Sequence, residues 1–153
     1  MKVTKENFPE VECIAGVATA GIPQGALLAD ALDLPFIYVR SKPKGHGLEN
    51  MIEGKITKKQ KVVIMEDLIS TGGSSLKAAE ALKDSGFKIL GMVAIFTYGF
   101  ELAQSNFEKA GIKLFTLSNY GDMLLAAENK GMVSNKDMLQ LKSWRVDPEN
   151  WGR

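Results

Sequence analysis

Short apolar runs along the chain alternate with longer stretches in which apolar residues recur every three or four positions. The short runs are rich in β-branched and aromatic residues, which predicts strands. The longer stretches carry one apolar stripe, which predicts amphipathic helices. The predicted strands are 13–17, 36–39, 62–65, 89–96 and 114–117, and the predicted helices are 2–7, 22–32, 74–85, 100–110, 120–130 and one that begins at Ser134.

This alternation of strands and helices predicts the fold class. Successive strands separated by helices form a parallel sheet with right-handed crossovers. Glycines follow three of the predicted helices, at Gly86, Gly111 and Gly131, where a helix commonly ends. We therefore expect an α/β fold: a twisted, mostly parallel sheet with helices on both faces.

Segment 40–54 breaks this pattern. It has no apolar period, and it carries glycines, a proline and ionisable groups of both signs. Long segments without regular structure inside a compact domain are usually functional lids or disordered. We expect a mobile loop that is disordered in the absence of ligand.

Composition narrows the class of protein. The chain has 153 residues, 45% of them hydrophobic, which suits one globular domain over 1–153. A formal net charge of +1 gives no support for a nucleic-acid partner or a membrane surface. No apolar run approaches the roughly 20 residues of a membrane span. Cys13 is the one cysteine and the start is too polar for a signal peptide, so a cytoplasmic location is expected.

The segment after the predicted strand 62–65 carries the most specific chemistry. Glu66 and Asp67 follow the strand, and the hydroxyl and glycine loop 70–74 precedes a helix. In an open α/β sheet, ligands bind outside the carboxyl ends of the strands. Carboxylates can hold ribose hydroxyls, and the N–H groups of a loop that opens a helix can hold a phosphate. An ordinary capped turn is the alternative, but the pair and the loop together favour a phosphorylated sugar.

The same segment resembles the phosphoribosyl-pyrophosphate signature of the type I phosphoribosyltransferases. The resemblance implies that Glu66 and Asp67 hold the ribose hydroxyls. Segment 16–23 resembles the family's short pyrophosphate loop, which implies contacts from Thr19 and Ala20. The implied cradle of the 5-phosphate comprises Ser70, Thr71, Gly72, Gly73 and Ser74, with Ser70 also touching the base.

Segment 40–47 resembles the catalytic loop of the orotate phosphoribosyltransferases, with its pattern Arg-Lys-x-x-Lys-x-His-Gly. The serine at position 41 departs from that pattern, and a solvated basic loop is the alternative interpretation. The resemblance implies that three cationic or titratable side chains bind pyrophosphate and, with Asp67, are catalytic. They are Arg40, Lys44 and His46.

The resemblance also implies a reaction: orotate and phosphoribosyl pyrophosphate give orotidine 5-monophosphate and pyrophosphate. The implied cofactor is Mg²⁺, held mainly through the substrate rather than by protein ligands. The implied assembly is a homodimer in which loop 40–54 of one subunit reaches the active site of the other.

Two departures from the family pattern bear on the base. Family members carry a further N-terminal segment that forms a hood over the base, and we expect this chain to be a fragment without it, weakly active or inactive. Segment 97–101 lacks the arginine that the family often has there. A purine-type phosphoribosyltransferase and a non-catalytic regulator that binds phosphoribosyl pyrophosphate remain alternatives. The tryptophans at 144 and 151 are expected to pack the tail against the body or a partner subunit.

Overall fold

A six-stranded sheet forms the centre of the computed structural model, which describes residues 1–40, 51–55, 57 and 59–151. The strand order is β3-β2-β1-β4-β5-β6. All neighbouring pairs are parallel except β2 and β3, which are antiparallel. The strands are β1 (Cys13–Val17), β2 (Phe36–Val39), β3 (Ile52–Glu53), β4 (Lys61–Ile69), β5 (Lys88–Thr97) and β6 (Leu114–Asn119). The predicted fold class is confirmed.

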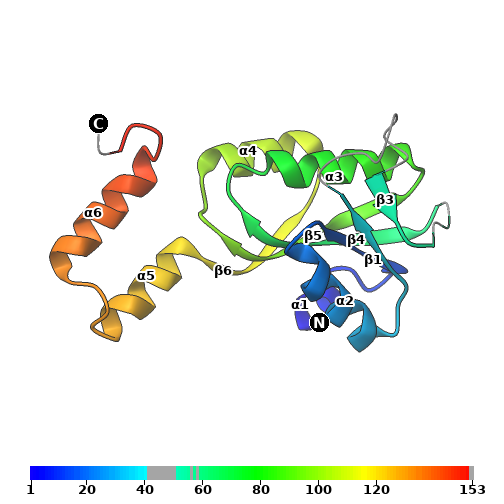
Figure 1. Ribbon diagram of the computed structural model, residues 1–153, viewed down its shortest axis with the longest axis horizontal. Coiled ribbons are helices and arrows are strands. Elements are labelled where there is room, and N and C mark those ends of the chain that lie inside the picture. Colours follow the sequence, from blue (N-terminus) through cyan, green and yellow to red (C-terminus); the bar gives the residue numbers. More distant parts are fainter. Residues whose placement is uncertain (41–50, 56, 58, 152–153) are drawn as a thin grey trace.

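Helices cover both faces of this sheet (Figure 1). They are α1 (Lys2–Asn7), α2 (Gly21–Leu32), α3 (Gly73–Asp84), α4 (Glu101–Ala110), α5 (Tyr120–Asn129) and α6 (Asn135–Val146). The first two helices lie on one face and α3 and α4 on the other, while α5 and α6 extend beyond the end of β6 (Figure 1). Ser134 begins α6 with a capping box that Asp137 completes, as its sequence spacing predicts.

Two apolar clusters hold the layers together because strand side chains alternate between the faces. On β1, Cys13 and Ala15 pack with the α3 and α4 side, whereas Ile14 packs with Phe8 and Leu28 on the other side. All five residues of β1 are buried, as expected for a central strand of a parallel sheet. The buried centre of the sheet therefore supports the loops that follow its strands.

The structure corrects the sequence prediction in the segment 40–54. Met51 and Ile52 are buried, and the Arg40 N–H donates to the Met51 carbonyl at 2.7 Å. Strand β3 pairs with β2, with Val39 opposite Ile52. The prediction of a mobile loop is wrong for 51–53 because two apolar side chains enter the core there. Residues 41–50 lie outside the described residues.

Strand β4 is also longer than predicted. It continues past Met65 to Ile69, and the extension pairs with β5, with Glu66 opposite Ala94 and Leu68 opposite Phe96. Glu66 and Asp67 therefore lie within the strand rather than after it. The neighbouring strand, which runs to Thr97, supplies the hydrogen bonds that keep the polar residues extended.

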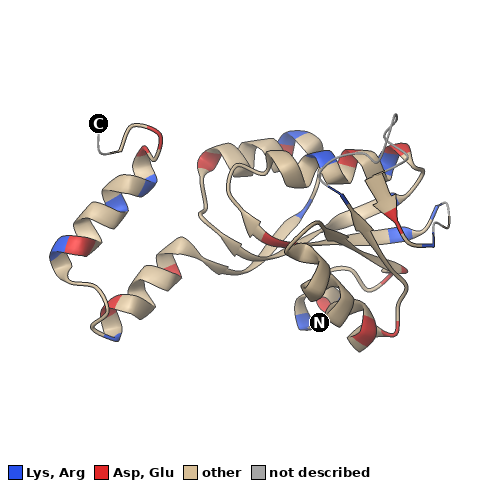
Figure 2. Ribbon diagram, viewed as in Figure 1, with Lys and Arg blue, Asp and Glu red and all other residues tan. Residues whose placement is uncertain are grey.

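Charged side chains of both signs are interspersed over the helices (Figure 2). No face drawn there is covered by one sign alone, in agreement with the net charge of +1. None of the helices in the described part of the chain is long and apolar enough to cross a membrane.

Candidate functional site

A hollow of about 550 Å³ lies at the carboxyl ends of β1, β2 and β4, against the first turns of α3. This is the edge at which parallel α/β sheets bind ligands. The residues that line it are Val17, Ala18, Arg40, Met51, Glu66, Asp67, Leu68, Gly73, Ser74, Lys77 and Ala78. The structure thus brings together five of the predicted site residues: Arg40, Glu66, Asp67, Gly73 and Ser74.

Glu66 is the buried member of the carboxylate pair, with 5% of its surface exposed. One carboxylate oxygen accepts a hydrogen bond from the Ser75 hydroxyl at 2.8 Å, and the other accepts from the Asp67 N–H at 3.1 Å. Burial, together with the adjacent Asp67 carboxyl, raises the pKa of Glu66 to about 7, and the hydrogen bond from the Ser75 hydroxyl opposes this rise. Near neutral pH, Glu66 therefore carries a proton part of the time.

Asp67 is the accessible member of the pair. Its side chain is half-buried and lines the hollow beside Glu66. Adjacent strand residues point to opposite faces, so the two carboxylates meet different surroundings although they adjoin in sequence. The family resemblance implies that both carboxylates hold the ribose hydroxyls, whereas Glu66 is buried and Asp67 is half-buried.

The loop 70–74 leads into α3 and has a glycine, Gly72, at a position where a side chain cannot fit. Gly72 is the N-cap with φ +82°, and a Cβ there would lie 2.7 Å from the Phe107 ring. No side chain caps this helix end, so its first N–H groups are free of a capping side chain, as a phosphate site requires. The exposed members of the loop are Ser70, Thr71, Gly73 and Ser74.

Ser75 differs from the other hydroxyls of this segment. It is 1% exposed, and its hydroxyl donates to Glu66 rather than facing the hollow. This bond joins the first turn of α3 to β4. Ser75 is therefore a structural link between loop 70–74 and the carboxylate pair.

The loop between β1 and α2 follows the predicted pattern of small residues. Thr19 and Ala20 are exposed at its tip, and Ala18 lines the hollow. A Cβ on Gly21 would lie 2.6 Å from the Met65 carbonyl oxygen, so this position excludes side chains. The loop can therefore approach the β4 backbone closely.

Arg40 extends from the end of β2 into the hollow. Its Nη1 donates to Glu53 at 3.2 Å, a partly exposed ion pair. Lys44 and His46, the other predicted cations, lie outside the described residues. Lys77 lines the same hollow and was missed by the sequence reasoning. Its position three residues after Ser74, and so on the same helix face, is the signal that could have found it.

No group of three or more His, Cys, Asp or Glu side chains that could hold a metal ion occurs among the described residues. Glu66 and Asp67 are the two carboxylates that line the hollow. They fit a cation that is held jointly with substrate oxygens, which is the usual arrangement for Mg²⁺.

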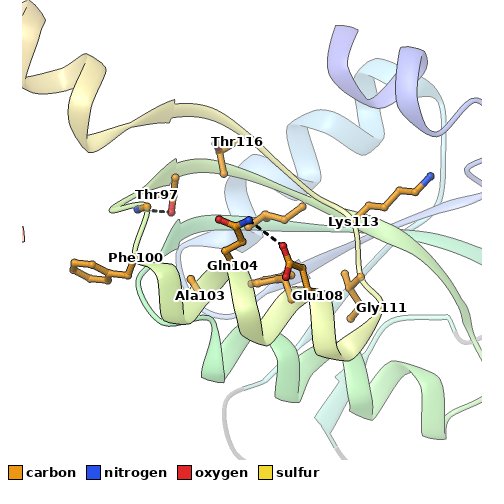
Figure 3. A pocket seen from close by; sticks show the side chains of 12 residues that line it. Thr97, Phe100, Ala103, Gln104, Glu108, Gly111, Lys113 and Thr116 are labelled. Carbon is orange, nitrogen blue, oxygen red and sulfur yellow. Dashed lines mark hydrogen bonds between the residues drawn. The ribbon is translucent and has the colours of Figure 1, made fainter. Parts of the chain in front are cut away.

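A second hollow of about 600 Å³ lies between α4 and the strands β5 and β6 (Figure 3). Gln104 donates to Glu108 at 2.9 Å on its helix side, and Lys113 extends away from it (Figure 3). It shares no lining residue with the hollow over β4. Its Glu108 and Lys113 make no cluster with the carboxylate pair, so it is not the candidate site.

Ser70 and Thr71 line a third hollow, of about 670 Å³, on the other side of the phosphate loop. The residues after β5 and the end of α6 form its remaining walls. The predicted base contact, Ser70, thus lies in a different hollow from Gly73 and Ser74. Both hollows border loop 70–74, which contributes Gly73 and Ser74 to one and Ser70 and Thr71 to the other.

Comparison with known proteins agrees with this geometry. The model of the phosphoribosyl transferase domain family matches residues 5–119. An orotate phosphoribosyltransferase of Cytophaga hutchinsonii is 59% identical over 147 residues, which are 96% of this chain and 70% of that protein. The Porphyromonas gingivalis orotate phosphoribosyltransferase is 56% identical over 99% of this chain and 72% of its own length.

Solved structures show the same fold. The orotate phosphoribosyltransferase of Aeropyrum pernix superposes with a TM-score of 0.72 at 29% identity, covering 86% of this chain and 71% of that one. The Leishmania donovani UMP synthase gives a TM-score of 0.79 over 95% of this chain and 31% of that one, at 22% identity, which bears on the fold alone. On these matches, this chain belongs to the orotate phosphoribosyltransferase family.

Proposed function

We propose that the chain transfers the 5-phosphoribosyl group from phosphoribosyl pyrophosphate to orotate, giving orotidine 5-monophosphate and pyrophosphate. Relatives named for this activity match almost the whole chain. The observation that carries the proposal is the placement of an accessible carboxylate, Asp67, beside an uncapped helix N-terminus. We also propose that residues 1–153 form a single phosphoribosyltransferase core domain.

The reaction breaks the bond between C1 of the ribose and the pyrophosphate oxygen. Positive charge grows on the ribose ring and negative charge on the leaving group. Asp67 is proposed to hold the ribose hydroxyls, where its negative charge also favours the developing ring cation. The N–H groups at Gly73 and Ser74 are proposed to hold the 5-phosphate.

Glu66 has a different proposed role because it is buried. Its bond to the Ser75 hydroxyl joins the phosphate loop to the strand that carries Asp67. The first turn of α3 is thereby tied to β4 at the carboxylate pair. Glu66 is proposed to contact the ribose with the part of its carboxylate that reaches the hollow, while it also holds the two halves of the sugar site in register.

The pyrophosphate requires cations. Arg40 and Lys77 line the hollow, and the resemblance adds Lys44 and His46, with Thr19 and Ala20 contacting pyrophosphate mainly through the backbone. Positively charged groups placed where negative charge develops stabilise the transition state. Asp67, the accessible carboxylate of the hollow, would hold Mg²⁺ together with substrate oxygens, and the ion would supply positive charge against the leaving group. A homodimer, in which loop 40–54 reaches the neighbouring subunit, is proposed from the family resemblance.

Calorimetric titration of the chain with phosphoribosyl pyrophosphate, with and without Mg²⁺, tests the sugar site. We expect saturable binding that Mg²⁺ strengthens and that the double substitution Glu66→Ala, Asp67→Ala abolishes. The matched control is Glu80→Ala, Asp84→Ala, which removes two exposed carboxylates from α3 away from the hollow. Binding that survives the first double substitution, or is absent in the folded wild-type chain, contradicts the proposal.

A further inference from the structure

The hollow beside Ser70 and Thr71 is built from three segments far apart in the sequence. The loop after β4 supplies one wall, residues 98–102 after β5 supply the second, and residues 144–149 at the end of α6 supply the third. In Figure 1, the C-terminal end of α6 is the end of that helix nearer to the start of α4. Ser70 and Thr71 of loop 70–74 therefore face the same hollow as the end of α6.

Two neighbouring residues of α6 attach it to the segment after β5. The Trp144 ring lies 5.4 Å from the Tyr98 ring and 5.3 Å from the Tyr120 ring, centroid to centroid. The Arg145 guanidinium donates to the Tyr98 carbonyl at 2.9 Å and to the Gly99 carbonyl at 2.6 Å. Both acceptors are backbone carbonyls, so the main chain after β5 orients the guanidinium.

The charge of Arg145 has no carboxylate partner within ion-pair distance in the described part of the chain. Carbonyl oxygens accept two of its hydrogen bonds, and a guanidinium has further N–H donors to offer. Among the residues that line the hollow it is the one cation, whereas Glu101, Asp147 and Glu149 are acidic. An anion can therefore be accommodated favourably here only against Arg145.

We propose that Arg145 receives the carboxylate of orotate and so selects this base, an inference that rests on the proposed function. Orotate is a planar pyrimidine whose carboxylate sets it apart from uracil, and arginine binds a carboxylate with two parallel hydrogen bonds. The rings of Tyr98 and Phe100, stacked with centroids 5.5 Å apart, offer apolar surface to a planar ring. Ser70, which the family resemblance assigns to the base, lines the same hollow.

This assignment makes the last helix part of the acceptor site. Arg145 places a guanidinium at the segment after β5 from a part of the chain more than 40 residues away. A charge-assisted pair of hydrogen bonds corresponds to a preference of about 10- to 100-fold for a ligand that carries the carboxylate.

Calorimetric titration with orotidine 5-monophosphate and uridine 5-monophosphate tests the proposal, because these nucleotides differ only in the carboxylate. We expect the wild-type chain to bind the first about 10- to 100-fold more tightly. Arg145→Gln should remove this preference by weakening orotidine 5-monophosphate binding alone, and Arg145→Lys should retain part of it. Lys142→Gln, which removes an exposed cation from the same helix, is the matched control and should change neither affinity.

The outcomes separate this inference from the proposed function. Equal weakening of both nucleotides by Arg145→Gln means that the residue only holds α6 in place, and overturns the inference. A wild-type preference that survives Arg145→Gln, or an absent preference in a chain that binds phosphoribosyl pyrophosphate, also overturns it. Failure of the folded wild-type chain to bind phosphoribosyl pyrophosphate overturns the proposed function itself.

Discussion

The hollow over β4, which is the proposed sugar site (the sugar hollow), and the hollow beside α6, which is the proposed acceptor site (the acceptor hollow), are built in opposite ways. Glu66, Asp67, Gly73 and Ser74 of the sugar hollow lie within nine consecutive residues, 66–74, on a strand and helix that belong to the main core. The acceptor hollow joins three distant segments, one of which is a helix with a single buried residue, Met138. Local sequence therefore encodes the first, and the packing of a peripheral helix completes the second.

The two regions also differ in how firmly they are held. The core next to the sugar hollow has fully buried side chains such as Ile64 and Leu82. In α6, Leu139 is 72% exposed and Val146 is 86% exposed. Elements with few buried apolar contacts open at lower free energy than core elements. The acceptor side should thus loosen first under denaturant, while the sugar side persists.

The largest expected effect is on the sugar side. Asp67→Asn keeps the shape of the side chain and removes its charge, so kcat/KM should fall on the order of 10²-fold or more, as for loss of one electrostatic contact to the transition state. Steady-state kinetics with varied phosphoribosyl pyrophosphate measures this. Asp84→Asn, exposed at the far end of α3, is the control. A kcat/KM near the wild-type value would show that Asp67 has no catalytic role.

Gly72→Ala should destabilise the chain by roughly 1–3 kcal/mol, because the residue has a left-handed φ of +82° and the new Cβ meets the Phe107 ring. Gly73→Ala is the matched control, since a Cβ there has nothing within 4 Å. Urea unfolding of the two variants gives the comparison. Equal stabilities would show that α3 can begin without the tight turn at Gly72.

The pH dependence of the free energy of unfolding tests the raised pKa of Glu66. Its pKa is about 7 in the folded chain against an ordinary value of 4.5, so the folded state holds a proton that the unfolded state has lost between these values. The free energy of unfolding should decrease as pH rises from 4.5 to 7, by at most about 1.4 kcal/mol per pH unit.

Glu66→Gln should flatten this part of the profile. Urea unfolding at a series of pH values measures both proteins. Because Ser75 opposes the rise in the pKa of Glu66, Ser75→Ala should move the loss of stability to higher pH. An unchanged profile in Glu66→Gln would assign the effect to another group.

The smallest expected effect is on the acceptor side. Ser134→Ala removes the capping box of α6 and should cost about 1 kcal/mol of stability in that helix. Affinity for orotidine 5-monophosphate should fall slightly while affinity for phosphoribosyl pyrophosphate stays constant. Hydrogen exchange confined to α6 measures the loosening. A loss that spreads to β4 would show that the two hollows are one cooperative unit.

The sequence predicted the elements of the core well because the spacing of the apolar residues and the length of each apolar run indicate the same type of element there. Strand 36–39 was placed at its observed bounds, and the turn glycines at 86 and 111 have the expected positive φ. Strand β3 was missed because Ile52 and Glu53 are too short a run to show any period. The extension of β4 was missed because its polar residues are kept extended by pairing with β5.

Part of the candidate site was also predictable from the sequence. Consecutive residues predicted that the carboxylate pair and loop 70–74 lie together, since strand, turn and helix follow one another without a break. The different burial of Glu66 and Asp67 was not predictable, because it depends on which face of β4 the α3 helix covers. Helical spacing from Ser74 could have predicted that Lys77 lies near the site, but nothing in the adjacent sequence distinguishes it from a lysine on a solvated surface.

Residue types and their order were enough to specify the parallel sheet, the turn at Gly72 and the chemistry of segment 66–74, because each of these depends on neighbours along the chain. The approach of Arg145 to the carbonyls of Tyr98 and Gly99 depends on contacts between residues more than 40 positions apart. Aromatic packing on Trp144 brings them together, and no local pattern encodes that packing. The tertiary structure alone therefore decides where the guanidinium of Arg145 is placed.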